Sequence, residues 1–455
     1  MLTNSRVAVL DLTHGGMVLA RKLKKIAAHV TGIDVYKTLS LEDSEGLEKE
    51  GINTSQMPVN LDDFDVIVAP VHLDPGYPML ADAENNNIPI ISHHAAVGEI
   101  LSHINLEDKT IIEITGTKAK TSTSLLLAEV LSRDRKVVSH TSRGVEDWST
   151  KKTIKTGLSI TPASILTAMD AIDEAGIDAD VLIFEISLGG TGCADIGVIT
   201  TISGDYMIAN NTKLASDAKR QMILNARPGS SLVINYYALR SFGACRRDVN
   251  VISFSDSVNA ACNVYYEDIS NKGVKIASYL NKRQARISIH ENPNYDIGSY
   301  RTAFVCATAA ALAMDVDAET IEHTLQEFRG VEGRMRKTAF CGRTLIDNSN
   351  SGMNIRVAES ALQYSKAPGG KIVMVLGEEA KEVCEGLDPS GVRKFIDMHL
   401  DELYALVLVG ERMRPLALDN AAKIQYATSL SEGIELAKRV TRDKDIILSC
   451  VKCFR

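Results

Sequence analysis

Short apolar runs rich in β-branched residues alternate along the chain with segments that repeat apolar positions at helical spacing. A turn separates each apolar run from the helical segment that follows it. This alternation is typical of α/β proteins, whose parallel strands are buried on both faces and are connected by helices. Because the chain has 455 residues and a domain typically has roughly 100–200, we expect several domains of this kind.

The first segment, residues 1–107, predicts a small Rossmann-like sheet. Strands are expected at residues 7–11, 30–36, 65–69 and 88–91, and a helix at residues 17–28. Asp34 lies about where a ribose-binding acid falls in dinucleotide-binding proteins, but the full G-x-G-x-x-G fingerprint is missing. We therefore expect this segment to bind another kind of ligand, with NAD binding left as an alternative.

Two further α/β segments follow, at residues 108–337 and 338–455. Strands are expected at residues 110–115, 180–184, 197–202 and 231–235, and then at 343–347, 371–377, 404–410 and 445–449. A helix over residues 302–314 is apolar on every side, so we expect it to be buried. Gly377 and Gly410 close two strands of the third segment, as is typical of turns beside a ligand crevice.

The charge balance argues against a dedicated nucleic-acid binder. The chain has 50 basic and 58 acidic residues, a net charge of -8, whereas nucleic-acid binders normally carry a basic excess. Residues 302–314 are too short for a membrane-spanning helix, which needs about 20 residues. We therefore expect neither nucleic acid nor membrane as a partner.

The cysteines and the N-terminus indicate in which cellular compartment we expect the chain. Eight cysteines are scattered along the chain, and Arg6 and Asp11 bracket only a short apolar run, so we expect no signal peptide and reduced thiols. The pair Cys450 and Cys453 is a single C-x-x-C, which is a weak zinc motif without a second pair. The chain is therefore predicted to be cytoplasmic.

The most informative stretch is a loop between a predicted strand and a predicted helix at residues 122–131. Polyphosphate binding needs backbone N–H groups at a helix N-terminus, a lysine that reaches the outer phosphates, and a hydroxyl for Mg²⁺. The candidate nucleotide-binding residues are Gly116, Thr117, Lys118, Ala119, Lys120, Thr121 and Ser122. Lys120 is the predicted phosphate-binding lysine, and Thr121 is the predicted Mg²⁺ ligand.

Glu185 ends another predicted strand and is followed by the glycine turn at Gly189 and Gly190. An acid at the carboxyl end of a parallel strand can hold Mg²⁺ against the phosphates. We therefore predict Glu185 as a metal ligand, with a solvated acid at the strand end as the alternative.

The loop and Glu185 together resemble the Mur ligase family, which includes folylpolyglutamate synthase. In that family the loop reads G-T-x-G-K-T-[ST], so Ala119 stands where a glycine is usual. The resemblance implies an N-terminal Rossmann-like domain at residues 1–107 that binds substrate. It also implies a central P-loop ATPase-type domain at 108–337 and a C-terminal Rossmann-like domain at 338–455 that closes on the nucleotide. ATP and Mg²⁺ are the implied cofactors, and Lys219 matches the lysine that several members carbamylate to bind a second Mg²⁺.

Further matches to the family lie beyond the loop. The stretch from Phe328 to Met335 looks like the family's F-x-G-x-x-G-R motif, which gives Arg334 the role of contacting nucleotide phosphate. Asp347 matches the aspartate that contacts ribose and phosphate, with Asn348 beside it. The resemblance therefore implies Lys120, Glu185, Lys219 and Arg334 as the catalytic set.

Two family motifs are altered. The histidine expected between the glutamate and the lysine is missing, and Asp205 lies in that stretch as a candidate for its metal role. The adenine-site H-N-x-x-N pattern is replaced by Ser299-Tyr-Arg-Thr-Ala303, so the preference for a base is less well defined than phosphate binding.

With these two altered motifs, the sequence resembles one archaeal branch of the family. This branch contains the Mur-like ligases that complete coenzyme F-430, the nickel tetrapyrrole of methanogenesis. That resemblance implies an ATP-dependent ring closure on an anionic nickel tetrapyrrole (seco-F-430), in which a propionate becomes an acyl phosphate and a ring carbon attacks it. The sequence does not indicate the oligomeric state.

The histidines of the first segment are candidates for contact with the macrocycle. His14, His93 and His94 are predicted to ligate nickel or hydrogen-bond its carboxylates, with ordinary packed histidines as the alternative. His72 and His103 belong to the same group. Arg143 is a candidate carboxylate clamp because its guanidinium can bind in a bidentate manner.

Three other functions stay open at this point. A Mur-type ligase that joins an amine to a carboxylate would release ADP only when the amine is present. A regulator without turnover would bind ATP and release no phosphate. A dehydrogenase built on the first segment would require NAD(H) binding.

Overall fold

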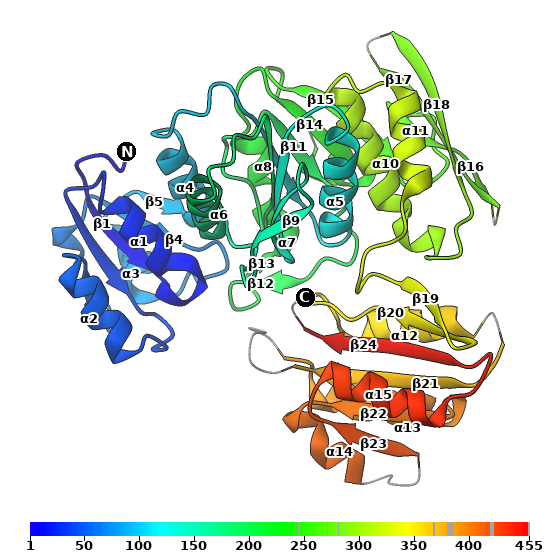
Figure 1. Ribbon diagram of the computed structural model, residues 1–455. Helices are drawn as coiled ribbons and strands as arrows, with labels where there is room; N and C mark the ends of the chain where they lie inside the picture. Colours follow the sequence, from blue (N-terminus) through cyan, green and yellow to red (C-terminus); the bar gives the residue numbers. More distant parts are fainter. Residues whose placement is uncertain are drawn as a thin grey trace. The chain divides into compact units, whose positions relative to one another are not determined.

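The computed structural model describes residues 1–243, 246–270, 272–280, 282–366, 369–379, 386–418 and 423–453 (Figure 1). The chain forms two compact units. The first unit contains Met1–Ser270, Val274–Ile289 and Thr302–Gln326, and most of the second is Glu327–Arg455. In the described part of the chain, no helix is both long enough and apolar enough to cross a membrane.

The first sheet of the first unit is wholly parallel. In sheet order its strands are β3 (Asn53–Ser55), β2 (His29–Ile33), β1 (Arg6–Leu10), β4 (Val66–Ala69) and β5 (Ile90–Ser92). Its helices are α1 (Met17–Leu23), α2 (Leu41–Lys49), α3 (Pro78–Asn85) and α4 (His93–Leu101). Val7, Ala8, Val9 and Leu10 of β1 are all buried because both faces of the sheet are covered.

One helix of this sheet is shorter than the sequence predicted. The helix expected at residues 17–28 ends at Leu23, and Lys24 caps it. The next residues turn back, and the N–H of Ala28 donates to Ser5 O at the start of β1. The prediction was too long because Ile26 and Ala27 are apolar. They pack against the core from this turn and not from a helix.

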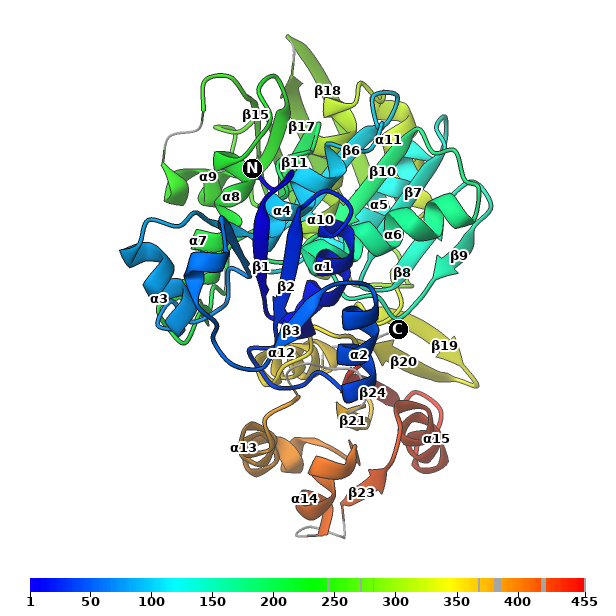
Figure 2. The same ribbon diagram turned by 90° about the vertical axis from the view of Figure 1, so that its left-hand side faces the viewer.

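Helices α1, α4 and α6 (Pro162–Glu174) pack against one another and join the first sheet to the central one. Leu19, Val97 and Ile165, one from each helix, are fully buried in the same core. Figure 2 shows β1, β2 and β3 side by side, with α1 beside them.

The central sheet has 11 strands and is parallel from β15 to β7. In sheet order the strands are β18 (Arg283–His290), β17 (Gly273–Leu280), β16 (Val264–Ser270), β15 (Asn250–Ser255), β14 (Ser231–Asn235), β11 (Ile196–Ile199), β6 (Thr110–Thr115), β10 (Val181–Glu185), β7 (Val137–Thr141), β8 (Gly144–Asp147) and β9 (Lys152–Lys155). The strand β6 lies between β10 and β11, so the segments that follow these three strands share one edge of the sheet.

The other elements of the central region are helices and one pair of two-residue strands. They are α5 (Lys120–Leu131), β12 (Met207–Ile208), β13 (Lys213–Leu214), α7 (Ala215–Lys219), α8 (Gln221–Leu224), α9 (Tyr236–Phe242), α10 (Ile297–Ala313) and α11 (Ala318–Glu327). The helix predicted at residues 302–314 corresponds to α10, and its burial is confirmed at Phe304, Cys306 and Ala310, each 0% exposed.

The second unit holds a six-stranded sheet, parallel except for its first strand. In sheet order the strands are β19 (Arg336–Phe340), β20 (Arg343–Asp347), β24 (Ile446–Lys452), β21 (Ile372–Glu378), β22 (Ala405–Val409) and β23 (Ile424–Ala427). The helices are α12 (Ile355–Ser365), α13 (Pro389–His399), α14 (Arg414–Leu418) and α15 (Leu430–Val440). The domain boundaries predicted at residues 107 and 337 stay predictions.

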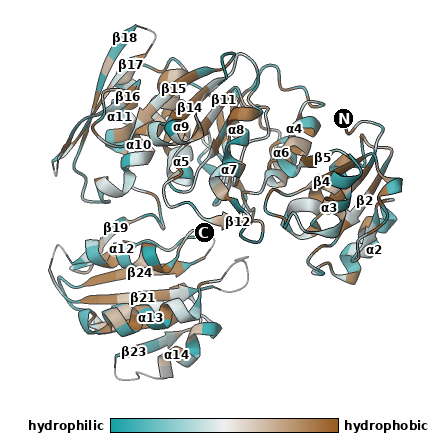
Figure 3. Cartoon of the chain, turned by 180° about the vertical axis from the view of Figure 1, so that it is seen from behind, coloured by the Kyte–Doolittle hydropathy of each residue, from teal (hydrophilic) through white to brown (hydrophobic). Residues whose placement is uncertain are grey.

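Successive residues of the central strands in this sheet enter two different cores. Leu406 and Leu408 belong to one core, and Val407 and Val409 belong to the core on the other face. The strands β21 and β24 are therefore mainly hydrophobic along their length (Figure 3). Cys450 and Cys453 lie in these two different cores, so the C-x-x-C motif does not form a joint metal site.

Candidate active site

The loop after β6 has the tight backbone that polyphosphate binding requires. Gly116 has φ 147°, and a Cβ there would lie 2.0 Å from Thr200 Oγ1. Ala119 has φ 65° and directly precedes α5, with no side-chain cap on the helix. The helix N-terminus therefore lies directly at the loop, where the helix dipole favours negative charge.

The loop is fixed to the segment that follows β11. The N–H and hydroxyl of Thr117 both donate to Thr201 O, at 2.8 and 3.1 Å. In return, Thr200 Oγ1 donates to Lys118 O at 2.6 Å. These bonds join the loop to the segment after β11 at both Thr117 and Lys118.

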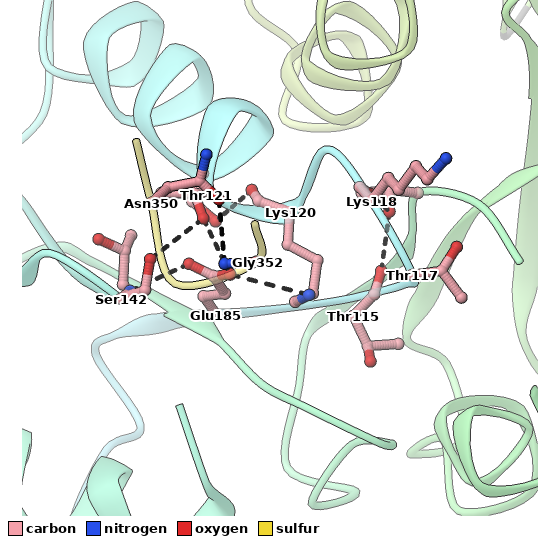
Figure 4. Close-up of polar contacts among 12 residues, drawn as sticks. Thr115, Thr117, Lys118, Lys120, Thr121, Ser142, Glu185, Asn350 and Gly352 are labelled. Carbon is pink, nitrogen blue, oxygen red and sulfur yellow. Dashed lines mark hydrogen bonds and ion pairs between the residues drawn. The ribbon is translucent and has the colours of Figure 1, made fainter. Parts of the chain in front are cut away.

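The predicted residues Lys120, Thr121 and Glu185 lie together at this edge of the sheet (Figure 4). Thr121 Oγ1 donates to Glu185 Oε1 at 3.0 Å, and Lys120 Nζ lies 4.0 Å from the same oxygen. The N–H of Ser142 donates to Glu185 Oε2 at 3.1 Å. The carboxylate is 2% exposed, so the hydrogen bonds and the nearby ammonium group offset the cost of burying its charge.

These groups fit a magnesium ion. A threonine hydroxyl and a carboxylate are hard oxygen donors, which Mg²⁺ prefers, and they lie beside the loop that would hold phosphates. The solvated strand-end alternative for Glu185 does not hold, because the side chain is buried and accepts two hydrogen bonds.

Lys219, the last residue of α7, is almost fully buried at 1% exposure. Its Nζ donates to Ala215 O at 3.3 Å and lies 5.1 Å from the centre of the Tyr206 ring. Burial and, to a smaller extent, the charge of Lys120 together lower the pKa of Lys219 to about 8, although Asp205 opposes the change. The amine is therefore far less basic than an exposed lysine.

Asp205 fixes the start of the same helix. Its Oδ1 accepts the N–H groups of Tyr206 and Ser216, each at 3.0 Å. The candidate metal role of Asp205 stays a prediction, since its contacts in the structure are with the backbone.

The second unit assembles the other predicted nucleotide residues. Arg334 Nη1 donates to Asn350 Oδ1 at 2.9 Å, and the N–H of Gly333 donates to Asp347 Oδ2 at 3.0 Å. Asn350 also donates to Gly333 O and Asn348 O, at 2.8 and 2.9 Å. The arginine, the aspartate and both asparagines therefore form one hydrogen-bonded group at the carboxyl end of β20.

The altered adenine motif has a structural role in this group. The Tyr300 hydroxyl donates to Arg334 O at 2.6 Å and accepts the N–H of Val331 at 2.8 Å. The ring makes edge contacts with Tyr295 and Phe328, with centroids 5.1 Å apart in each case. Tyr300 thus supports the backbone that carries Arg334.

His93 and His94 lie inside the fold instead of at a surface. They are 1% and 2% exposed, and each bonds a backbone carbonyl, Leu10 O at 2.9 Å and Ser187 O at 2.8 Å. Burial lowers the pKa of both rings to about 4, so both are neutral near pH 7. They hold the start of α4 against the neighbouring strands, which is the packed-histidine alternative, and the predicted macrocycle contact has no support here.

Arg143 and His14 are both partly exposed. Arg143 follows Ser142 directly and lies 3.6 Å from Glu146, and its carboxylate-clamp role stays a prediction. His14 is 28% exposed and contacts Asp11.

Sequence reasoning missed two residues of the phosphate site, Ser142 and Thr200. Ser142 contacts Glu185 through its backbone N–H and Thr121 through its hydroxyl, and it reaches both from the end of another strand, β7. Thr200 contacts the loop from a segment 82 residues further along the chain, and only the order of the strands in the sheet brings it there.

Comparison with known proteins identifies the family. Residues 337–453 match the family described as "Coenzyme F430 synthetase CfbE, C-terminal domain". A "Coenzyme F(430) synthetase" of Methanosarcina acetivorans is 46% identical over 475 residues and covers 100% of both chains. A "UDP-N-acetylmuramoylalanine--D-glutamate ligase" of Pelotomaculum thermopropionicum is 25% identical and covers 99% of this chain and 93% of its own.

A solved structure supports the architecture. The MurF ligase of Thermotoga maritima, determined in complex with ADP, matches with a TM-score of 0.52 and 13% identity, over 94% of this chain and 92% of its own. The predicted Mur ligase-like α/β fold is thereby confirmed. The 46% identity over the full length also confirms the branch of the family that the sequence motifs predicted. The chain belongs to the coenzyme F(430) synthetase family of Mur-like ligases.

Proposed function

We propose that the chain is an ATP-dependent ligase that phosphorylates a propionate of seco-F-430 and closes the carbocyclic ring of coenzyme F-430. The similarity to the Methanosarcina acetivorans protein named "Coenzyme F(430) synthetase" supports the product. The observation that carries the chemistry is the cluster of Lys120, Thr121 and Glu185 beside the tight loop after β6. Mg-ATP is the nucleotide that these groups fit, and we place the reaction in the cytoplasm.

The first step is phosphoryl transfer. A carboxylate oxygen of the substrate attacks the γ-phosphorus of ATP, the bond to the bridging oxygen breaks, and ADP leaves. The loop N–H groups and Lys120 stabilise the negative charge on the transferred group. Thr121 and Glu185 would hold Mg²⁺, which would supply further charge neutralisation at the phosphates.

The second step is ring closure. A ring carbon that has lost a proton attacks the acyl carbon, a C–C bond forms, and phosphate leaves. The tetrapyrrole loses one water overall, because the carboxylate oxygen departs with phosphate. The nucleophile is part of the same molecule, so no amino acid is consumed.

The remaining predicted residues have roles in the same proposal. Arg334 is assigned to nucleotide phosphate, and Asp347 and Asn348 to the ribose and phosphate. Lys219, with its lowered pKa, is assigned to a carbamate that binds a second Mg²⁺. His14 and Arg143 are assigned to the anionic macrocycle, for which partial exposure is the support.

An amide-forming ligase is the second candidate. The 25% identity to a UDP-N-acetylmuramoylalanine--D-glutamate ligase favours it, because that relative covers almost all of the chain. It would use the same acyl phosphate but an amine as the nucleophile.

The test is to incubate the full chain with ATP, Mg²⁺ and seco-F-430, and to follow ADP and product mass together. Loss of one water from the tetrapyrrole per ADP supports the proposal. ADP release that requires an added amine supports the second candidate, and no ADP with either substrate overturns both.

Two variants test the site. Lys120→Ala should lower kcat by at least about 100-fold, since a preorganised charge that stabilises the transition state is worth roughly 3–4 kcal/mol. Lys152→Ala removes an exposed lysine of β9 and should leave kcat unchanged. Equal losses in both variants would contradict the assigned role of Lys120.

A further inference from the structure

A turn at the end of β1 wraps around the carboxylate of Asp11. Asp11 is fully buried and has φ 68°, a left-handed conformation that is costly for a residue with a side chain. Its Oδ1 accepts the N–H groups of Thr13 and His14, at 3.0 and 3.2 Å. The other oxygen, Oδ2, is turned toward two histidines.

The two glycines that follow make this turn possible. A Cβ on Gly16 would lie 2.0 Å from Asp11 O, and a Cβ on Gly15, where φ is 92°, would lie 2.8 Å from the Cβ of Ala163. Leu12–Gly16 is therefore a specific backbone structure, and it fixes where the ring of His14 lies.

Two imidazoles converge on Asp11 Oδ2. His14 Nδ1 lies 2.7 Å from this oxygen, and His72 Nε2 lies 3.4 Å from it. The two rings meet edge to face, with centroids 5.2 Å apart. One donor atom from each of the three residues lies within 4.8 Å of the others.

The position of the cluster is that of a ligand site. Asp11 follows β1 and His72 follows β4, and the sheet order reverses between these two strands. In open parallel sheets, ligands bind at the carboxyl ends of the strands at this reversal. His14 and His72 are 28% and 29% exposed, so two of the three groups are open to solvent beside the buried carboxylate.

The charge of the cluster suits a cation. Asp11 Oδ1 accepts two backbone N–H groups, and Oδ2 faces two imidazole rings, so every contact of the side chain suits the ionised form. The buried group is thus a carboxylate, and a bound cation would neutralise it.

We propose that Asp11, His14 and His72 form a binding site for a divalent transition-metal ion, separate from the magnesium site at Glu185. Two imidazole nitrogens and one carboxylate oxygen suit Ni²⁺, Co²⁺ or Zn²⁺, whereas Mg²⁺ and Ca²⁺ prefer oxygen donors alone. Three protein ligands would leave coordination positions that a carboxylate of a bound ligand could occupy. The site does not depend on the proposed function.

The probe is Co²⁺ added to the metal-free full chain in excess Mg²⁺, which occupies oxygen-only sites. One Co²⁺ per chain should bind and give visible d–d bands without the intense near-ultraviolet band of thiolate ligation. Ni²⁺ and Zn²⁺ should displace it, which calorimetry measures as competition.

Two variants distinguish the site from scattered binding. His72→Ala removes a partly exposed ligand and should weaken Co²⁺ binding at least about tenfold, a loss seen even for residues that only support a ligand. His29→Ala removes an exposed histidine outside the cluster and should leave the affinity unchanged. Failure of the wild-type chain to bind one Co²⁺, or equal affinity in His72→Ala and wild type, overturns the proposal and leaves Asp11 with a purely structural role.

Discussion

At the scale of single residues, the lowered pKa of Lys219 has a chemical consequence. Carbamate formation requires the neutral amine. At pH 8 about half of an amine with a pKa of about 8 is neutral, against roughly 0.3% of an exposed lysine with a pKa near 10.5. We therefore expect ¹³C-bicarbonate to give one carbamate signal by NMR at pH 8, and Lys219→Arg to abolish it.

Lys213 provides the matched control for this experiment. It is exposed in β13, a few residues before the end of α7, so Lys213→Arg should leave the carbamate signal intact. A signal that persists in Lys219→Arg would assign the carbamate elsewhere and contradict the role proposed for Lys219.

Glu113, in the middle of β6, makes the stability of the first unit depend on pH. Burial raises the pKa of Glu113 to about 7, although the N–H and hydroxyl of Thr191 both donate to it. In the unfolded chain its pKa is near 4.5, so between pH 4.5 and 7 the folded state binds more protons. The contribution of protonated Glu113 to the free energy of unfolding is thus fully present below pH 4.5 and is lost as the pH rises through 7.

Glu113→Gln should remove this dependence. At pH 5 the variant and the wild type should have similar unfolding free energies, whereas at pH 8 the variant should be more stable by up to about 3 kcal/mol. Urea unfolding at both pH values measures this difference. Glu107→Gln, at a surface position, should show no such change, and a Glu113→Gln variant that is no more stable than the wild type at pH 8 would refute the interpretation.

At the scale of elements, the start of α5 carries backbone strain. Ala119 has φ 65°, where alanine is less stable than glycine by about 1 kcal/mol. Ala119→Gly should therefore stabilise the first unit by about that amount in urea unfolding. Ala128→Gly, in the interior of the same helix, should have the opposite effect, by about 1 kcal/mol. Destabilisation by both variants would show that the loop is not strained at residue 119.

The sequence predicted many of the buried parallel strands, although it missed β7 and β15. The bounds of β6, β14 and β20 agree with the prediction to the residue, because a polar residue stands at both ends of each strand. The strands β16–β18 were not predicted, since they expose polar side chains along much of their length. Their pairing depends on neighbouring strands more than on their own pattern.

The candidate site was predictable where a residue type carries the chemistry. Lys120, Thr121 and Glu185 were predicted from motifs, and the structure brings them together. The role of His93 and His94 was ambiguous, because a histidine that binds a ligand and a histidine that packs in the core cannot be distinguished from the sequence. Only tertiary packing distinguishes them, and it also brings His72 to Asp11 from an adjacent strand.

At the scale of the whole molecule, each compact unit has cores of its own. Leu182 of β10 is buried in a core of the first unit, and Leu408 of β22 is buried in a core of the second. Chains with several units commonly depart from two-state unfolding. We therefore expect calorimetry of the full chain to give two transitions, or one whose calorimetric enthalpy exceeds the van't Hoff enthalpy.

Core substitutions assign the two transitions. Leu182→Ala and Leu408→Ala each leave a cavity that costs about 2–5 kcal/mol, but only in the unit whose core is changed. Each variant should lower the midpoint of one transition by several degrees and leave the other in place. If the units unfolded as one, both variants would lower a single transition together, and the division of the chain into two cooperative units would be wrong. Separate responses would also let ligands be assigned by calorimetry, because a ligand stabilises only the unit that binds it.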